Sequence, residues 1–510
     1  MMIKKIIIVG GGSAGWMTAA TLIHQFPKKK IVVIESPNIP TVGVGESTIV
    51  QINRWKTMLG IKDEEFMKYC DASYKLSIRF EDFYKKGDGG FHYPFGQVDV
   101  EDNKAGLNDW YFKKFTDPSV PVSDYAESVY PVMSLIKENK ITDKNIFSTF
   151  NINRDAAYHM DATKFGLWLK DHYCLPRGVK HIEEDIKTIQ QDDEGIKSLN
   201  HKHKADLYID CTGFKSLLLG EALQSEFLDY SSLLPNNSAW ATKIAYKNKK
   251  RELKCYTNCR ALDNGWMWQI PLWSRLGAGY VYSNKFISDK EALTEFKKQL
   301  PKGKHIFKNI KMKVGIHKEL WKKNVCAIGL AAGFIEPLES NGLYTVHEFL
   351  LQLCRSLARE EVSQWDKDLF TWSCRLTFDR FAEFVALHYA LSHRQDTPYW
   401  KHNFNKRFYP AHVENLSKYN STTFFTVSWN RFEHFQYSPS EGVHAIATGL
   451  HFFPTDQSAL QYYNLQGNIN RWKNEWKSIM VNLERKKKRW KEIIKNEPVL
   501  YDYLKENIYK

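Results

Sequence analysis

The sequence predicts an α/β protein built on a doubly wound, mainly parallel sheet, and its N-terminal segment carries that prediction. Residues 3–9 (IKKIIIV) form a β-rich run that enters the glycine-rich stretch GGGSAG, and residues 16–26 (WMTAATLIHQF) then have helical spacing. Residues 30–36 (KIVVIES) follow as a second strand. Strand, glycine turn, helix and strand, in this order, open a doubly wound sheet.

Later segments extend this architecture. Because three further strand-like runs are far apart in the chain, we expect strands from distant segments to share one sheet: ADLYIDCTGF, SAWATKIAY and NVCAIGLAAGF, at residues 205–214, 238–246 and 324–334. Residues 75–160 are rich in aromatic residues and loops, whereas the pattern from residue 341 onward is mostly helical. We therefore expect a core at 1–350 with inserted sheet and loop regions, and a mainly helical region at 351–510 packed beside it.

Composition limits the class of protein. The chain has 510 residues, of which 43% are hydrophobic, enough for a large core. No segment reaches the roughly 18 uninterrupted apolar residues of a membrane span, and the first apolar stretch is too short for a secretory signal. The eight cysteines include no CxxC pair and no zinc-binding spacing, and Cys255 and Cys259 are interpreted as plain thiols. These features predict a reduced, soluble, cytoplasmic protein without a metal site or a membrane partner.

The formal charge of +14 raises the question of nucleic-acid binding. The excess is scattered, with one dense cluster at residues 483–498 (LERKKKRWKEIIKNEP) that mixes acids with bases. Such a mixture is typical of a solvated helix, so we expect no nucleic-acid partner. A positive field also favours small anions near the surface, but it identifies none of them.

The glycine turn after the first strand fits the GxGxxG pattern of a dinucleotide site. Its first glycine permits a tight turn, the second lets a diphosphate approach the backbone, and the third allows the helix to pack closely on the strand. The N-terminus of the following helix carries a partial positive charge that favours phosphates. The alternative is a tight turn with no ligand. The residues expected to hold the cofactor here are Gly10, Gly12, Ser13, Ala14 and Gly15.

The rest of the N-terminal half favours FAD over NAD. Glu35 ends the second strand, where a carboxylate accepts hydrogen bonds from an adenosine ribose. DLYIDCTGF, at residues 206–214, resembles a strand that recurs in FAD-dependent oxygenases. AIGLAAGF places Gly329 and Leu330 at the start of a helix far along the chain from the first glycine turn. A second loop of this kind is expected for a flavin that extends across the domain.

Several segments in fixed order resemble the flavin-dependent tryptophan halogenase family. They are the glycine turn, GVGES at 43–47, YKLSIRF at 74–80, GWMWQIP at 265–271 and GFIEPLESNGLY at 333–344. The resemblance implies an FAD-binding fold with a C-terminal region on the substrate side, and it adds Gly45 and Glu46 to the cofactor contacts. It also implies a chemistry: reduced FAD from a separate flavin reductase reacts with oxygen and halide to give hypohalous acid. That oxidant then travels to a separate pocket and halogenates an electron-rich aromatic molecule.

The resemblance implies two catalytic residues, Lys75 and Glu339. Lys75 matches the family's lysine, whose ammonium can hydrogen-bond the oxidant or whose amine can carry the halogen covalently. Glu339 matches the glutamate that assists the lysine and the substrate, and it can take the proton released by the arene. Without the resemblance, Lys75 would be interpreted as an exposed lysine. Glu336 is the competing acid, and we expect a structural role for it.

The segment after Glu339 is expected to bind halide and substrate. Ser340 is expected to contact substrate or oxidant; the alternative is a helix cap. The backbone N–H groups of Asn341 and Gly342 match the place where the family holds its halide, and exposed amides at a helix start are a plausible anion site. The family usually has threonine in place of Asn341. From this difference we expect bromide and iodide, which are easier to oxidise and to dehydrate, to be preferred over chloride.

The WxWxIP motif places Trp266 and Trp268 on one face of an extended segment. In the family this motif lies near the flavin and keeps organic substrate away from it. We therefore expect Trp266, Trp268, Ile270 and Pro271 to line the flavin side. The alternative is an ordinary core, since burying an indole of about 200 Å² contributes roughly 5 kcal/mol.

The substrate is expected to be broader than free tryptophan. Tyr93 and Phe95 fall where better-known members place a histidine and a phenylalanine around the indole. Phe95 fits that pattern and Tyr93 does not, so we expect an indole, a phenol or a larger heteroaromatic. Two other functions remain open: a flavin-dependent hydroxylase (monooxygenase) and a flavoprotein with a binding role.

Overall fold

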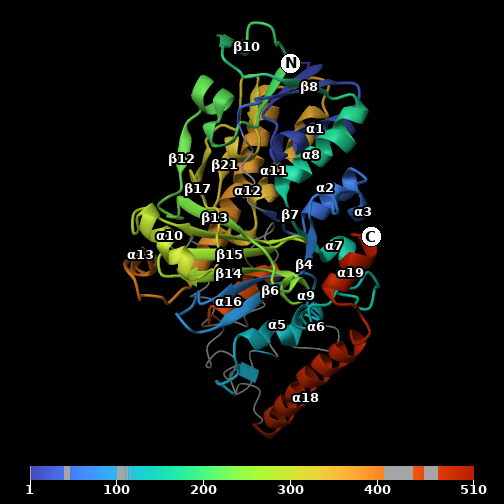
Figure 1. Ribbon diagram of the computed structural model, residues 1–510, viewed down its shortest axis with the longest axis vertical. Helices are drawn as coiled ribbons and strands as arrows, with labels where there is room; N and C mark the ends of the chain where they lie inside the picture. Colours follow the sequence, from blue (N-terminus) through green and yellow to red (C-terminus); the bar gives the residue numbers. More distant parts are fainter. Residues whose placement is uncertain are drawn as a thin grey trace.

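A six-stranded sheet forms one end of the molecule (Figure 1). The computed structural model describes residues 2–39, 46–99, 110, 113–114, 117–406, 440–452 and 469–510. Pairing in this sheet is parallel except between its first two strands. In spatial order the strands are β19 (Trp321–Lys322), β20 (Val325–Ala327), β11 (Leu207–Asp210), β1 (Lys5–Val9), β2 (Lys30–Glu35) and β8 (Lys180–Glu183). The predicted α/β class and the shared sheet of distant strands are confirmed.

For one predicted strand, the sheet to which it was assigned is wrong. Residues 238–246 contain β13 (Ser238–Ile244), which belongs to a separate seven-stranded sheet and pairs with β16 (Leu276–Tyr282) and β17 (Lys308–Lys311). An apolar run specifies that a strand is buried but not which strand it pairs with. The order of this second sheet is β17, β13, β16, β15 (Gly265–Pro271), β14 (Tyr256–Leu262), β5 (Ser77–Glu81) and β6 (Gly90–Pro94).

The segment at residues 75–160 is more regular than its composition indicates. It supplies β5 and β6 to the second sheet. It also contributes to a small sheet of β3 (Glu46–Ser47), β7 (Ala157–Met160) and β4 (Ser73–Lys75). The remaining sheets are β12 (Phe227–Asp229), β18 (Gly315–His317) and β21 (Gly333–Phe334), and the hairpin of β9 (Ile189–Asp192) and β10 (Gly195–Leu199).

Helices cover the sheets. The first is α1 (Ser13–Gln25), which packs against α8 (Ala162–Trp168) and α11 (Gly342–Leu357). The long α12 (Gln364–Ala390) begins at a capping box, where the Ser363 hydroxyl accepts the N–H of Asp366. Other helices are α2 (Ile52–Met58), α3 (Asp63–Phe66), α5 (Ser123–Val129), α6 (Val132–Lys137), α7 (Ile152–Asp155), α9 (Lys249–Glu252) and α10 (Asp289–Lys298).

After residue 341 the named elements are all helices. Those beyond α12 are α13 (Pro398–Lys406), α16 (Ser440–Gly449), α18 (Ile469–Ile493) and α19 (Leu500–Asn507). The basic cluster lies largely on α18, which extends from the lower end of the molecule in Figure 1. Lys487 of this cluster pairs with Asp124 of α5, and Lys486 Nζ lies 3.8 Å from Asp99, so part of this charge is paired. In the described part of the chain, no helix is long and apolar enough to span a bilayer.

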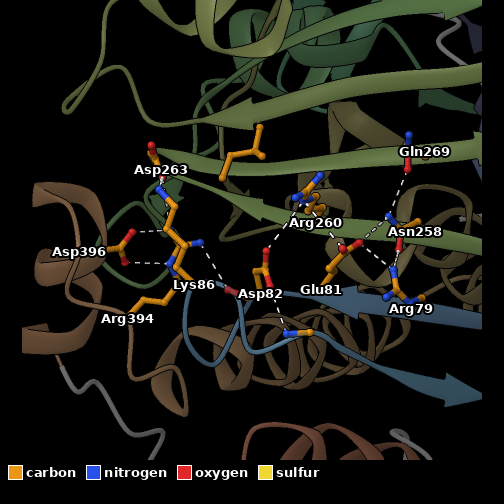
Figure 2. Close-up of polar contacts among 12 residues, drawn as sticks. Arg79, Glu81, Asp82, Lys86, Asn258, Arg260, Asp263, Gln269, Arg394 and Asp396 are labelled. Atoms are coloured by element: carbon orange, nitrogen blue, oxygen red, sulfur yellow. Dashed lines mark hydrogen bonds and ion pairs between the residues drawn. The ribbon is translucent and has the colours of Figure 1, made fainter. Parts of the chain in front are cut away.

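A polar network fastens the segment after α12 to the second sheet (Figure 2). Arg394 is almost fully buried and binds Asp396 through two hydrogen bonds of 2.9 and 2.6 Å. Its Nη2 also lies 3.6 Å from Asp263, which Lys86 contacts at 2.7 Å. The network therefore joins the segment that follows α12 to the turn between β14 and β15.

Candidate active site

The glycine turn after β1 has the tight geometry that the motif predicts. Gly10 has φ +113°, and a Cβ added there would lie 2.3 Å from the carbonyl oxygen of Cys211. A Cβ on Gly15 would lie 1.9 Å from the carbonyl oxygen of Gly10. Gly12 caps α1 in an extended conformation with no side-chain hydrogen bond, and the first turn of α1 contains no acid. The positive end of this helix is therefore left available for an anion.

Glu35 lies beside this turn, at the end of β2. A Cβ on Gly11 would meet the carboxylate of Glu35 at 2.1 Å, so only glycine permits this approach. The carboxylate is a quarter exposed, and its Oε2 lies 3.0 Å from Nε2 of His181 on β8. His181 packs edge-on against Trp16 of α1. No sequence motif indicates His181, because its contact with Glu35 arises from parallel pairing of distant strands.

The downstream loop reaches the same turn. Gly329 has φ +70°, and a Cβ there would lie 2.8 Å from the Cβ of Ala14. Gly329 and Leu330 therefore lie next to the start of α1, as a cofactor spanning both loops requires. Of the two remaining predicted contacts, Glu46 begins β3 but its side chain lies outside the described residues, as does Gly45. Convergence of an uncapped helix start, a carboxylate and a second glycine loop fits a dinucleotide such as FAD.

Lys75 ends β4 and is completely buried. Its Nζ donates hydrogen bonds to the carbonyl oxygen of Thr48 at 2.8 Å and to the Ser340 hydroxyl at 2.9 Å. The ammonium also lies 5.1 Å from the centre of the Phe95 ring. The adjacent Tyr74 points elsewhere and donates to Asp63 at 2.8 Å. The lysine is thus enclosed by protein. A residue that guides a diffusing oxidant has to be enclosed in this way.

Burial controls the acidity of Lys75. Desolvation lowers the pKa of its ammonium from 10.5 to about 7, although the negative charge of Glu339 acts in the opposite direction. Cys259 also lies close enough to interact with it electrostatically, and burial raises the pKa of that thiol. Near neutral pH, both the ammonium and the free amine of Lys75 are therefore populated.

Glu339 is paired with a histidine that the sequence did not indicate. Glu339 closes the 3-10 turn Pro337–Glu339, and its Oε1 lies 2.8 Å from Nε2 of His388 on α12. Both side chains are at most 1% exposed. His388 Nδ1 faces the carbonyl oxygens of Phe384 and Val385 at 3.2 Å, so both ring nitrogens face acceptors. Within the described residues neither Nε2 of His388 nor the Glu339 carboxylate has another hydrogen-bond partner, so each is the other's nearest polar group.

The residues after Glu339 form the start of α11. Ser340 has φ +59°, and its hydroxyl bonds Ser47 and Lys75 rather than capping the helix. Asn341 occupies the cap position, where its amide donates to the Ile335 carbonyl at 3.2 Å. Within the described residues, the N–H groups of Asn341 and Gly342 have no hydrogen-bond partner, nor has the buried Oδ1 of Asn341. Two backbone N–H groups at the start of α11 are therefore available to bind an anion, as far as the described residues show.

Trp266 and Trp268 point to the same face of β15, away from Met267, which packs in a different apolar cluster. Trp266 is fully buried and donates to Glu336 at 3.4 Å. Trp268 lies flat on β16, where a Cβ on Gly279 would be 2.0 Å from its ring. Both indoles therefore lie between the second sheet and the segment that carries Glu336 and Glu339. Ile270 and Pro271 continue the strand and are also buried, with Ile270 in the same cluster.

Glu336 has partners of its own. Its Oε2 accepts the amide of Asn236 at 2.6 Å, and that amide also bonds Tyr389 at 3.0 Å. Burial raises the pKa of Glu336 above its usual range. These contacts hold the Glu336 carboxylate in a local polar cluster with Asn236 and Tyr389.

Tyr93 and Phe95 form an aromatic wall next to Lys75. Their rings are perpendicular, with centres 5.7 Å apart, and Tyr93 also packs edge-on against Phe384 of α12. Helix α16 closes the wall: a Cβ on Gly442 would lie 2.5 Å from the Tyr93 hydroxyl oxygen. The wall therefore combines residues from β6, α12 and α16 beside the ammonium of Lys75.

Comparison with known proteins gives the family. The sequence pattern that defines the tryptophan halogenases matches residues 5–461. The chain is 33% identical to tryptophan 6-halogenase ThaL of Streptomyces albogriseolus, over 79% of each chain. It is 32% identical to tryptophan 7-halogenase RebH of Lentzea aerocolonigenes, over 82% of each chain. The protein therefore belongs to the tryptophan halogenase family, and it is an FADH2-dependent halogenase.

Solved structures agree with this assignment. The apo structure of VirX1 has a TM-score of 0.91 and 36% identity, with both chains fully covered. The tryptophan 6-halogenase SttH of Streptomyces toxytricini has a TM-score of 0.84 and 29% identity, covering 98% of this chain and 99% of SttH. The similarity thus includes the helical C-terminal region as well as the sheet that holds the glycine turn.

Proposed function

We propose that this protein makes hypohalous acid and delivers it through Lys75 to an electron-rich aromatic acceptor. The observation that carries the proposal is the enclosed ammonium of Lys75, which is held by Thr48 and Ser340 beside the ring of Phe95. A completely buried lysine without a paired carboxylate is costly for stability, and such groups are concentrated at functional sites.

Residues 1–350 are proposed to hold the cofactor, with residues 351–510 on the substrate side. The contacts are those predicted at the glycine turn, Glu35 and the loop at Gly329, together with Gly45 and Glu46. Reduced FAD, supplied by a separate flavin reductase, provides the reaction of oxygen with halide that yields hypohalous acid. The eight cysteines are all unpaired thiols, which suits the reducing cytoplasm.

Lys75 is proposed to orient the oxidant by one of two routes. The ammonium donates a hydrogen bond to hypohalous acid, or the free amine takes the halogen and water leaves. Because its pKa is about 7, either form of Lys75 is present at neutral pH. Glu339 then accepts the proton that the arene loses, and the contact with His388 holds its carboxylate in place.

The acceptor is proposed to be an indole, a phenol or a larger heteroaromatic. ThaL and RebH are tryptophan halogenases by name. The wall of Tyr93, Phe95 and Phe384 suits a flat aromatic ring. Exclusive turnover of free tryptophan across a panel of acceptors would contradict the proposal.

Halide is proposed to bind at the N–H groups of Asn341 and Gly342, with bromide and iodide preferred over chloride. The unpartnered donors at this helix start support the site. Competition between equal concentrations of the three halides tests the preference. Asn341→Thr is expected to shift product toward chloride, and a wild-type enzyme that prefers chloride would contradict the idea.

The proposed reaction is tested by mass spectrometry of products from FADH2, oxygen and each halide over a panel of indoles and phenols. Lys75→Met keeps the length of the side chain but removes the amine. It is expected to lose halogenation by at least about 100-fold, the usual scale for removing such a group, while FAD binding is retained. Oxygenated product that forms without halide, equally in both proteins, would instead identify a hydroxylase.

A further inference from the structure

A chain of buried hydroxyl groups joins Lys75 to a buried histidine. The Lys75 ammonium donates to Ser340 Oγ at 2.9 Å, and Ser340 donates to Ser47 Oγ at 3.1 Å. Ser47 lies 2.7 Å from Thr257 Oγ1, which lies 2.9 Å from Nε2 of His159. All of these side chains are at most 6% exposed. They come from β4, the start of α11, β3, β14 and β7, so the fold assembles the chain from separate segments.

The far end of the chain fixes its polarity. Ser73 Oγ lies 2.5 Å from the carbonyl oxygen of Pro271, which can only accept, so Ser73 donates its single proton there. Ser73 must then accept from Nδ1 of His159, 3.3 Å away. A neutral imidazole with its proton on Nδ1 has a free lone pair on Nε2, and this lone pair must accept from Thr257. Pro271 is the proline of the WxWxIP motif.

The same reasoning runs back to Lys75. Thr257 gives its only proton to His159, so its oxygen accepts from Ser47, and Ser47 in turn accepts from Ser340. Ser340 then accepts from Lys75, as its geometry requires. Every hydroxyl therefore donates in the direction of His159. That common direction is the one needed for stepwise proton transfer from the lysine to the imidazole.

We propose that this chain is a proton relay, which takes a proton from the Lys75 ammonium to His159 Nε2 and later returns it. The proposal rests on the proposed function and assigns His159, Thr257 and Ser47 as positioning residues for it. In the transfer, one N–H bond of Lys75 breaks and one N–H bond forms at His159, while each hydroxyl gains one proton and passes on its own. Lysine becomes a neutral amine and histidine becomes an imidazolium, so the charge is conserved.

The relay would make the amine available without access to solvent. The amine then attacks hypohalous acid, forming an N–halogen bond and releasing water. The arene then takes the halogen from nitrogen and loses its proton to Glu339, which passes that proton to the nitrogen and so restores the neutral amine. His159 finally returns the relay proton, and Lys75 becomes an ammonium again. The other hydrogen-bond partner of the ammonium, the carbonyl oxygen of Thr48, cannot hold a proton.

The charged groups around Lys75 and His159 favour a state in which only one of these two residues is protonated to its charged form. Glu339 and Cys259 act on Lys75, with His388 behind Glu339. Burial lowers the pKa of His159, and the positive charge of Lys75 lowers it further. Both groups are therefore not charged at once, and the imidazole gains basicity when the lysine loses its charge.

Breaking the relay at Thr257 tests its kinetic role. Thr257→Val has the same shape without the hydroxyl, and Thr257→Ser is the matched variant that keeps it. Below pH 7 we expect Thr257→Val to slow single-turnover halogenation at least 10-fold, with the difference narrowing as the pH rises and free amine becomes abundant. Thr257→Ser should restore the wild-type profile. A Thr257→Val profile that equals the wild-type profile at every pH would overturn the relay, and Ser47→Ala repeats the test at a second link.

The imidazole tautomer tests the relay without any halogenation. In protein labelled with ¹⁵N-histidine, the His159 signals are identified by their loss in His159→Gln. The expected result at neutral pH is a protonated Nδ1 and an unprotonated Nε2. A proton on Nε2 would reverse the polarity and overturn the relay even in an active halogenase. The expected tautomer in a protein that halogenates no acceptor would support the relay while contradicting the proposed function.

Discussion

His388 Nε2 lies 2.8 Å from Glu339 Oε1 in a region where neither side chain is more than 1% exposed. The two residues belong to different parts of the fold, a short turn before α11 and the long helix α12. The imidazole is oriented by the carbonyl oxygens of Phe384 and Val385, which face its Nδ1 at 3.2 Å, and by the ring of Phe80, which packs against it. The arrangement resembles the support that a second residue gives to a metal-bound or catalytic group.

His388→Gln should therefore lower kcat by roughly 10- to 100-fold, the range seen when a supporting partner is lost, with little change in KM. Glutamine still offers an N–H to the carboxylate but cannot share a proton with it. Tyr389→Phe is the control, since it alters the next residue of α12 and contacts the Asn236–Glu336 cluster instead. Steady-state kinetics make the comparison. Equal losses in both variants would assign the effect to the helix and not to the pair.

The stability of the protein should depend on pH through Lys75. Folding lowers the pKa of this lysine from 10.5 to about 7, so between these values the unfolded chain binds more protons than the folded chain. Stability then rises with pH across that window, by up to about 1.4 kcal/mol per pH unit. The destabilisation caused by burying the charged Lys75 is complete below pH 7 and disappears above pH 10.5. Urea unfolding of the wild type and Lys75→Met at several pH values isolates this effect, and a constant difference would contradict it.

Gly329→Ala should weaken FAD binding. The new Cβ would lie 2.8 Å from Ala14 and push the downstream loop away from the start of α1. Gly178→Ala is a matched control, because Gly178 also has a positive φ, +92°, but has no atom within 4 Å of the added Cβ. Both variants introduce backbone strain of about 1 kcal/mol, because alanine disfavours a positive φ. Only Gly329→Ala also introduces a steric clash with Ala14. Fluorescence titration with FAD should give at least a several-fold weaker Kd for Gly329→Ala alone.

Gly442→Ala should change acceptor selectivity. The added Cβ would meet the Tyr93 hydroxyl oxygen at 2.5 Å and its ring carbon at 2.6 Å, so the ring must move toward the space beside Phe95. We expect KM to rise most for the largest acceptors, with kcat for the smallest nearly unchanged. Product analysis over a size series makes the measurement. A uniform loss across all acceptors would indicate general destabilisation.

The glycine turn and its sheet are predictable from sequence because their signals are local. Residues 10–15 stand between a β-rich run and a helix, and Gly10 and Gly15 each have a steric reason that the motif encodes. Lys75 and Glu339 have no such local signal. Nothing near them in the chain distinguishes them from exposed charges, and only the family resemblance singles them out.

Contacts between distant segments account for what sequence reasoning missed. His159 meets Thr257 across 98 positions, and His181 reaches Glu35 across 146. Each contact depends on which strands pair, and an apolar run does not specify its partner strand. The misassigned sheet of residues 238–246 has the same cause. A histidine in a strand or helix therefore remains an ordinary residue until the topology is known.

The flat seating of Trp268 on Gly279 has a consequence for variation at this site. The indole fills the volume that a side chain at position 279 would occupy, so a substitution at either position changes the space available to the other. A larger residue at position 279 alone would displace the Trp268 indole. A smaller residue at position 268 alone would leave a cavity. Laboratory libraries that mutate the pair together, exchanging side-chain volume between β15 and β16, can reshape this face of the sheet while preserving its packing density.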